Sequence, residues 1–173
     1  MDEIAKLAVE LHGHLAPGIA LGIRMSSIAL EKLGATRGSR KLIAVSETYR
    51  CLADAMQAAT GCTLGHGNAF VHDCGKLALT IGRADTKNGV RIALKKDAHA
   101  HSQLMKKWMM REGKLTHAEE EELGRHLLNI EEKYFEIKQV KLNLKTEVNT
   151  SKIGACSKCG DLVPQDSLVN GMC

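Results

Sequence analysis

Residues 41–61 read KLIAVSETYRCLADAMQAATG and join two patterns in direct succession. The first part, residues 41–48, is a short apolar run typical of a buried strand. The second part, residues 51–60, is rich in alanine and predicts a helix that ends at Gly61, because glycine is the commonest residue just after a helix. A strand followed at once by a helix indicates a domain in which both kinds of element pack into one core.

The sequence on either side carries further helical and strand patterns. Apolar residues at helical spacing predict more helices, at residues 2–12, 17–34, 99–112 and 116–129. Apolar and alternating runs predict more strands, at residues 69–82, 89–95 and 134–142. Asn88-Gly89 predicts a hairpin turn over residues 86–89. Thr116 with Glu119 forms a capping box that opens the last of the helices.

The chain divides into three expected parts. They are an α+β core domain over residues 1–142, a polar linker over 143–155 and a cysteine-containing module over 156–173. The whole chain has 173 residues, which is enough for one domain with a hydrophobic core plus a small appendage.

The composition is 44% apolar and 25% charged, which is ordinary for a soluble globular protein. No apolar run approaches the ~20 residues of a membrane span. The N-terminal MDEIAKLAVE lacks the pattern of a secretory signal, so we expect a cytoplasmic protein with reduced thiols. The net charge of +4 comes with a basic block at residues 91–114, an acidic block at 119–136 and only 3% aromatic residues. This pattern favours solvated helix faces over a nucleic-acid-binding surface.

Three cysteines close the sequence and have the spacing of a zinc site. Cys156 and Cys159 form a Cys-x-x-Cys pair, and Cys173 follows across a segment that contains Gly160 and Gly171. Thiolates arranged in this way are typical of structural zinc. Roughly twenty residues with few large apolar side chains cannot bury a core, so we expect zinc to hold them folded. The fourth ligand is open: it comes from elsewhere, it is water, or the native chain continues past Cys173.

A second candidate metal site lies near the N-terminus, in the motif His12-Gly13-His14. Glycine between the two histidines allows the chain to turn both imidazoles inward, and such pairs suit zinc, iron, nickel or copper. The alternative is a helix cap with one buried, hydrogen-bonded histidine.

The segment around residue 51 supplies further candidates. Cys51 begins the helix of residues 51–60, where the helix dipole stabilises a thiolate and makes it a better ligand or nucleophile. Asp54 lies one turn further along this helix, and Cys62 lies in the glycine-rich loop that follows. Glu47 ends the preceding strand. We take Cys51 and Cys62 as candidate ligands, and Glu47, Cys51 and Asp54 as candidate catalytic residues.

These segments follow one another in a distinctive order: HGHLAPGIALGIRM at residues 12–25, SETYRCLADAMQAATGCTLGHGN at 46–68, DCGKLALTIGR at 73–83, and a terminal Cys-x-x-Cys-Gly with Asn-Gly before the next cysteine. In this order the chain resembles the E-subunit family of formylmethanofuran dehydrogenase over almost its whole length. The resemblance implies an α+β core with a mixed β-sheet flanked by helices, a homodimer, and a C-terminal zinc finger of treble-clef or ribbon type.

The resemblance also implies a metal-binding crevice in the core. Its residues, carried over to this sequence, are His12, His14 and Cys51, with Cys62 and Glu47 close by. This sequence departs from the family pattern at Ala16, where members usually have Cys, so one thiolate candidate is missing. The family finger usually has a fourth cysteine after the third, which makes truncation at Cys173 the simplest expectation for the missing ligand.

Two functions are consistent with these patterns. The first is a metal-binding accessory or regulatory protein, with a structural zinc finger and a second transition metal in the core. The family is named for a subunit of a molybdenum or tungsten dehydrogenase, so a larger complex of that type is an expected partner. The alternative is a metal-dependent enzyme that uses His12, His14 and Cys51 on a small anionic or one-carbon substrate.

Overall fold

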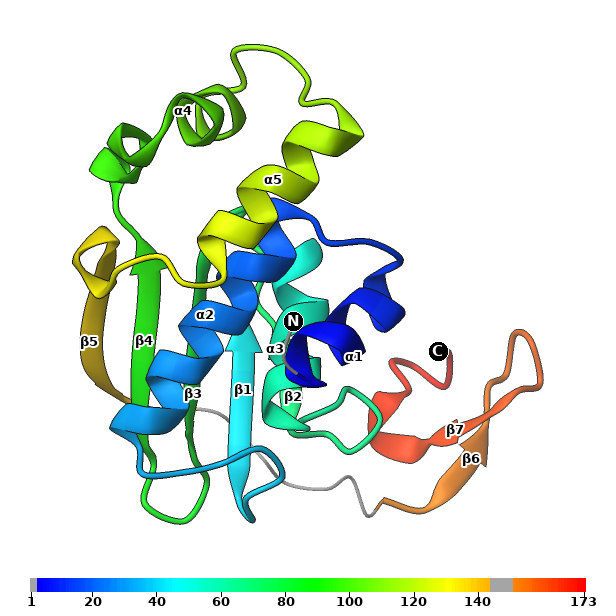
Figure 1. Cartoon of the computed structure of the whole chain (residues 1–173). Helices are drawn as coiled ribbons and strands as arrows, with labels where there is room; N and C mark the ends of the chain where they lie inside the picture. Colours follow the sequence, from blue (N-terminus) through cyan, green and yellow to red (C-terminus); the bar gives the residue numbers. More distant parts are fainter. Residues whose placement is uncertain (1–2, 144–150) are drawn as a thin grey trace.

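The computed structural model describes residues 3–143 and 151–173, which form an α+β core and a small C-terminal module (Figure 1). The helices of the core are α1 (Glu3–His12), α2 (Pro17–Lys32), α3 (Cys51–Thr60), α4 (Gln103–Met109) and α5 (His117–Leu127). Its strands are β1 (Leu42–Ser46), β2 (Ala69–Val71), β3 (Ala78–Arg83), β4 (Asn88–Leu94) and β5 (Phe135–Lys141). None of the described helices is long and apolar enough to cross a membrane.

The core strands form a mixed sheet in the order β2-β1-β3-β4-β5. β1 runs parallel to β2, with Val45 opposite Phe70, and antiparallel to β3, with Val45 opposite Thr80. Helices α1, α2 and α3 lie in front of this sheet in Figure 1. Between them lie fully buried side chains that include Ile81 and Ile92 from the sheet. The α+β fold with a mixed sheet and flanking helices is confirmed.

The strand expected over residues 69–82 is two strands, β2 and β3, on opposite sides of β1. Residues 72–77 connect them across the end of β1. The backbone N–H groups of Cys74 and Lys76 both donate to the Glu47 carbonyl, and Gly75 has a positive φ of 66°. The prediction of a single strand was therefore wrong, because the chain turns at residues 73–76. The apolar runs on both sides of this segment made the two strands look like one in the sequence.

The β3–β4 hairpin exists, but its turn lies earlier than predicted. Asn88 and Gly89 belong to β4, and the turn occupies residues 84–87 with Lys87 at a φ of 56°. The helix expected over residues 99–112 is also displaced. A 3-10 helix (Lys96–His101) comes first, and Ser102 then caps α4 by accepting a hydrogen bond from the Met105 N–H.

Two predicted helix ends are confirmed by their backbone geometry. α3 ends at Gly61, which is left-handed at a φ of 73°. α5 begins at Thr116, whose side chain accepts a hydrogen bond from the Glu119 N–H while the Glu119 carboxylate accepts one from the Thr116 N–H. Both signals are local, so they do not depend on how the helices pack.

Helices α2 and α3 pack closely because α2 presents a glycine to its neighbour. A Cβ at Gly22 would lie 2.5 Å from the Ala55 Cβ and 3.3 Å from the Leu52 Cα. Small residues along α2 permit such an approach, and Gly22 is where it occurs. This contact fixes α3, and with it Cys51 at the start of α3, against α2.

The Gly22→Ala substitution should lower the free energy of unfolding by about 1–3 kcal/mol, because the new methyl group has no space between the two backbones. An exposed glycine-to-alanine change within a helix normally acts in the opposite direction, since alanine is the better helix former. Chemical denaturation of both proteins would measure the difference. Gly65→Ala is a suitable control because open space surrounds Gly65. A stabilised Gly22→Ala protein would contradict the packing described here.

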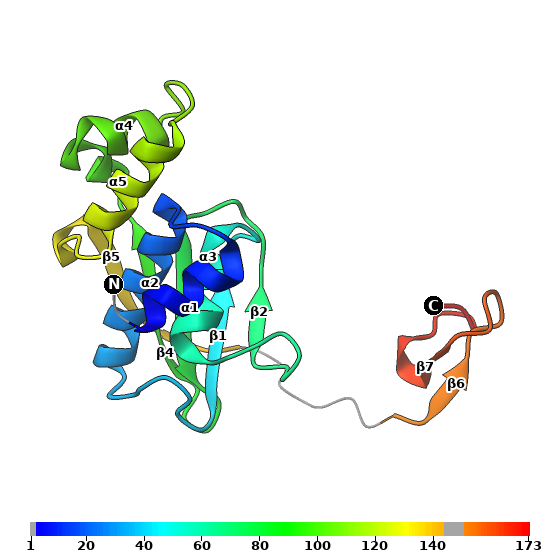
Figure 2. The same cartoon turned by 45° about the vertical axis from the view of Figure 1, so that its right-hand side comes forward.

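The C-terminal module contains β6 (Ile153–Ala155), β7 (Leu162–Pro164) and a short 3-10 helix (Gln165–Ser167). β6 and β7 pair antiparallel, with Gly154 opposite Val163. Figure 2 shows this hairpin apart from the core. Residues 144–150 of the expected linker lie outside the described residues, and residues 153–155 at its end form β6. The three-part division with its boundaries stays a prediction.

Candidate metal centre

The three cysteines of the module converge. The sulfur atoms of Cys156, Cys159 and Cys173 all lie within 4.8 Å of one another, and the sulfurs of Cys159 and Cys173 are 3.7 Å apart. Tetrahedral zinc with bonds of about 2.3 Å to sulfur would place two thiolates about 3.8 Å apart. The cysteine cluster, as we call these three residues, therefore fits a zinc-sized ion in both donor type and spacing.

The backbone around the cluster supports thiolates. Cys156 is 2% exposed, and its sulfur accepts hydrogen bonds of 3.4 Å from the N–H groups of Lys158 and Cys173. Backbone N–H groups, that of Cys159 first, lower the pKa of the Cys156 thiol to about 6. Hydrogen bonds with the Cys156 and Cys159 sulfurs raise the pKa of the Cys173 thiol. The Cys156 thiol can therefore lose its proton near neutral pH. The Cys173 thiol would lose its proton only when a metal binds.

Two tight turns bring the cysteines together. Gly160, at a φ of 81°, donates its N–H to the Cys156 carbonyl at 2.9 Å and closes the Cys-x-x-Cys turn. Asn170 and Gly171 both have positive φ and turn the chain back, so that the Ser157 N–H donates to the Gly171 carbonyl at 2.8 Å. Among the described residues, no fourth His, Cys, Asp or Glu joins the cluster at this spacing.

The histidines near the N-terminus also lie side by side. α1 ends at His12, and Gly13 reverses the chain at a φ of 98°. The ring centroids of His12 and His14 are then 5.2 Å apart. The Asp54 carboxylate lies 2.8 Å from the His12 Nδ1. A carboxylate that holds one ring nitrogen leaves the other free to bind a metal, as it does behind many metal-binding histidines.

Cys51 begins α3, as predicted, and packs against α2. A Cβ added to Gly18 would lie 2.9 Å from the Cys51 Cβ. Burial raises the pKa of the Cys51 thiol, and the negative charges of Asp54 and Glu120 raise it further. The helix dipole was expected to stabilise the thiolate, but desolvation outweighs it, so Cys51 is a protonated thiol unless a cation binds beside it.

The two other predicted residues, Cys62 and Glu47, have different surroundings. Cys62 is buried past the C-terminal end of α3, and ten helical residues at about 1.5 Å each separate it from Cys51 by roughly 15 Å. Burial also raises the pKa of its thiol. Glu47 forms two hydrogen bonds with the Arg91 guanidinium, one of them 2.8 Å long. Arg91 lowers the pKa of Glu47, which makes this carboxylate a weak base.

The structure brings His12, His14, Asp54 and Cys51 to the same end of α3 without closing a coordination sphere. Within residues 3–143 and 151–173, ligand atoms of three His, Cys, Asp or Glu residues gather within 4.8 Å only in the cysteine cluster. A metal at His12, His14 and Cys51 would have to draw these side chains together. This set stays a prediction.

Helix α5 adds polar residues that the sequence analysis did not single out. The His117 ring lies 5.8 Å from the His14 ring, centroid to centroid, and the Glu120 carboxylate lies 3.7 Å from the His14 Nε2. His117 and Glu120 are three residues apart on a helix and so share one face. The spacing of His117 and Glu120, next to the capping box, was the signal in the sequence that could have indicated this polar helix face. Only the fold reveals that this face meets His14.

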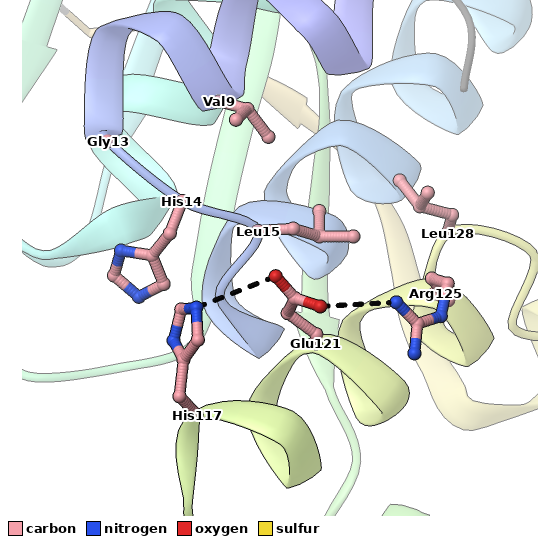
Figure 3. A pocket seen from close by; sticks show the side chains of 8 residues that line it. All are labelled: Val9, Gly13, His14, Leu15, His117, Glu121, Arg125 and Leu128. Carbon is pink, nitrogen blue, oxygen red and sulfur yellow. Dashed lines mark hydrogen bonds and ion pairs between the residues drawn. The ribbon is translucent and has the colours of Figure 1, made fainter.

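A cavity of about 500 Å³ opens beside these histidines (Figure 3). In Figure 3 the His14 and His117 rings lie next to each other at its edge, and Glu121 lies between His117 and Arg125. Its other walls are apolar. The residues that line it are Val9, Gly13, His14, Leu15, His117, Glu121, Arg125 and Leu128.

One family model matches residues 11–143, and its description is "FmdE, Molybdenum formylmethanofuran dehydrogenase operon". The chain belongs to the FmdE family. The match includes the two N-terminal histidines and Cys51, and it ends before the cysteine cluster. The resemblance inferred from the sequence motifs is therefore confirmed for the core of this FmdE-family protein.

The chain is also similar to a curated protein and to a solved structure. A protein of Archaeoglobus fulgidus named "Probable S-adenosyl-L-methionine-binding protein" is 34% identical over 183 aligned positions, which cover 96% of this chain and 50% of that protein. The chain thus spans about half the length of this curated relative. The crystal structure of an FmdE-like protein from Syntrophus aciditrophicus, named after tungsten formylmethanofuran dehydrogenase, has a TM-score of 0.80 and 26% identity, and the match covers 99% of this chain and 88% of that one.

Ala16 marks one difference between this FmdE-family protein and the motif expected from the resemblance. The residue is 6% exposed and stands directly before α2, as its N-cap. A methyl group at this position offers no ligand atom. Position 16 therefore supplies no ligand to a metal in the core.

Proposed function

We propose that this FmdE-family protein is a metal-binding accessory or regulatory protein, with structural zinc in the C-terminal module and a second transition metal in the core. The observation that carries this proposal is the cysteine cluster, in which Cys156, Cys159 and Cys173 have the donor type and spacing of a zinc site. The description of the family as part of a dehydrogenase operon is consistent with a role in a larger complex.

Zinc suits the cysteine cluster because thiolate ligands and tetrahedral spacing favour it. The module also needs such an ion. Several of its largest apolar side chains are exposed, namely Ile153 at 60%, Leu162 at 76% and Val169 at 73%. Residues 151–173 therefore bury little hydrophobic surface, and a metal would supply the free energy that keeps the module folded.

For the core we propose zinc, iron or nickel held by His12, His14 and Cys51. The hydrogen bond between Asp54 and His12 supports this proposal, because it fixes the tautomer and leaves the Nε2 available. A bound cation would also favour the Cys51 thiolate, which burial otherwise disfavours. We further propose a cytoplasmic homodimer that takes part in a molybdenum or tungsten dehydrogenase-type complex.

The alternative is a metal-dependent enzyme that acts on a small anionic or one-carbon substrate. The cavity of about 500 Å³ beside His14 favours it, since a small molecule fits there, although Arg125 is already paired with Glu121. Asp54 and Cys51 remain candidate catalytic residues, and the pairing with Arg91 makes Glu47 the weaker candidate. The name of the Archaeoglobus relative makes S-adenosyl-L-methionine a ligand to test.

Metal content per chain, measured by elemental mass spectrometry on protein purified without added metal, tests the proposal. Wild type should contain two metal ions. The Cys156→Ser/Cys159→Ser protein should lose one ion and the His14→Ala protein the other, whereas Cys74→Ser should keep both because Cys74 is exposed and outside both sites. If wild type contains one ion and loses it only in the Cys156→Ser/Cys159→Ser protein, the proposals of a core metal and of a metal-dependent enzyme are both excluded. No ion in wild type would overturn the whole proposal.

A further inference from the structure

His14 lies nearly as close to His117 of helix α5 as it does to His12. Its ring centroid is 5.8 Å from that of His117 and 5.2 Å from that of His12. Two imidazoles that bind one tetrahedral ion through bonds of about 2.1 Å have centroids roughly 5.2 Å apart. The separation of the His14 and His117 rings is therefore close to that of two imidazoles on one ion, although both side chains would have to rotate to bring one nitrogen each to it.

A carboxylate completes the group. The Glu120 Oε2 lies 3.7 Å from the His14 Nε2, and Glu120 is one helical turn from His117. The negative charge of Glu120 beside His14 would balance that of a cation bound there.

Helix α5 packs closely against the loop of residues 13–16, which contains His14, because α5 presents a glycine to this loop. A Cβ at Gly124 would lie 2.9 Å from the Leu15 Cγ and 3.0 Å from the Leu15 carbonyl oxygen. Leu15 directly follows His14 and is itself buried. The contact therefore fixes the distance between His14 and the first two turns of α5.

His12 and His117, the two histidines on either side of His14, each lie near a different carboxylate. Asp54 lies 2.8 Å from the His12 Nδ1, and Glu121 lies 3.5 Å from the His117 Nε2. Carboxylates placed in this way commonly orient metal-binding imidazoles and leave the second ring nitrogen for the metal. For His117 that nitrogen is Nδ1.

We propose that α5 completes the core metal centre, with His14, His117 and Glu120 as ligands of a divalent ion such as zinc. Two histidines and one glutamate are a known ligand set of zinc sites that keep an open fourth position. That position would face the cavity of about 500 Å³, whose edge both imidazoles form. This inference rests on the proposed core metal; it keeps His14 as a ligand and assigns His117 and Glu120 to the positions proposed above for His12 and Cys51.

Titration with Co²⁺ tests the inference, on the full chain whose cysteine cluster has first been filled with zinc. Absorption of tetrahedral Co²⁺ then reports on the core, and the titration gives its Kd. His117→Ala and Glu120→Gln should each weaken binding by at least about 10–100-fold. His126→Ala and Glu122→Gln are matched controls because both residues are exposed on the same helix; neither should change the Kd.

The outcomes separate this inference from the proposed function. Binding that is lost in His12→Ala or Cys51→Ser but unchanged in both α5 variants would overturn the role of α5 and leave the core metal standing. A wild type that binds zinc at the cysteine cluster and no Co²⁺ would overturn both the core metal and this inference. The His117 side chain is 70% exposed, so its loss should leave the fold intact, and circular dichroism would verify this.

Discussion

Removing the metal from the cysteine cluster should unfold residues 151–173 while the α+β core stays folded. Metal binding contributes on the order of 10 kcal/mol to the folding of small zinc-finger peptides, which is more than a module of this size can obtain from hydrophobic burial. The β6–β7 pairing spans only three residue pairs and cannot persist alone.

Nuclear magnetic resonance on uniformly labelled protein, before and after treatment with a chelator, would show this directly. The amide signals of residues 151–173 should collapse to unfolded positions, and those of residues 3–143 should stay dispersed. Cys156→Ser should have the same effect without chelator, whereas Cys74→Ser should have none. A module that keeps its dispersed signals without metal would show that its turns and backbone hydrogen bonds are sufficient.

The Arg91→Ala substitution should have the second largest effect, a loss of about 2–3 kcal/mol in the free energy of unfolding. The Glu47 side chain is only 13% exposed, and the substitution would leave its charge without the guanidinium. This expected loss is smaller than for a fully buried pair for two reasons. The Arg91 side chain is 25% exposed, and Lys76, which lies 4.0 Å from the Glu47 carboxylate, would still partly balance its charge.

The same pair predicts a pH dependence. Arg91 lowers the pKa of Glu47 in the folded protein below its ordinary value of 4.5. The folded state therefore binds fewer protons at this site than the unfolded state does. The stabilisation is fully present above a pH of about 4.5 and is lost as the pH falls through the lowered folded pKa. Arg91→Ala should flatten this part of the pH profile.

Urea denaturation at several pH values would measure both effects. Arg83→Ala is the control, because Arg83 pairs with Asp85 at the surface and its loss should leave the free energy of unfolding nearly unchanged. A double-mutant cycle with Glu47→Gln would isolate the energy of the pair. If Arg91→Ala and Arg83→Ala lower the free energy of unfolding equally, the Glu47–Arg91 pair stabilises the fold no more than a surface pair does.

Features that depend on neighbouring residues could be predicted from the sequence. The helix that ends at Gly61 and the capping box of Thr116 and Glu119 are local signals, and both are where the sequence placed them. The turn between Cys156 and Cys159, which Gly160 closes, is likewise a local feature. In each case a few consecutive residues fix the backbone geometry without help from distant parts of the chain.

Features that depend on long-range packing were mispredicted or missed. Residues 69–82 form two strands because β1 lies between them in the sheet, a pairing that no local pattern records. The sequence placed His12, His14, Cys51 and Cys62 in one site, but α3 separates Cys62 from Cys51 by its whole length.

The sequence by itself determined the family, the α+β class and the spacing of the C-terminal cysteines, because motifs and periodicities are properties of adjacent residues. Only the tertiary structure decided which side chains lie beside His14. Gly22 lets α3 approach α2, and Gly124 lets α5 approach Leu15, so that Cys51, His117 and Glu120 gather around one loop. These approaches depend on the shapes of surfaces that are distant in sequence and meet only when the core is packed.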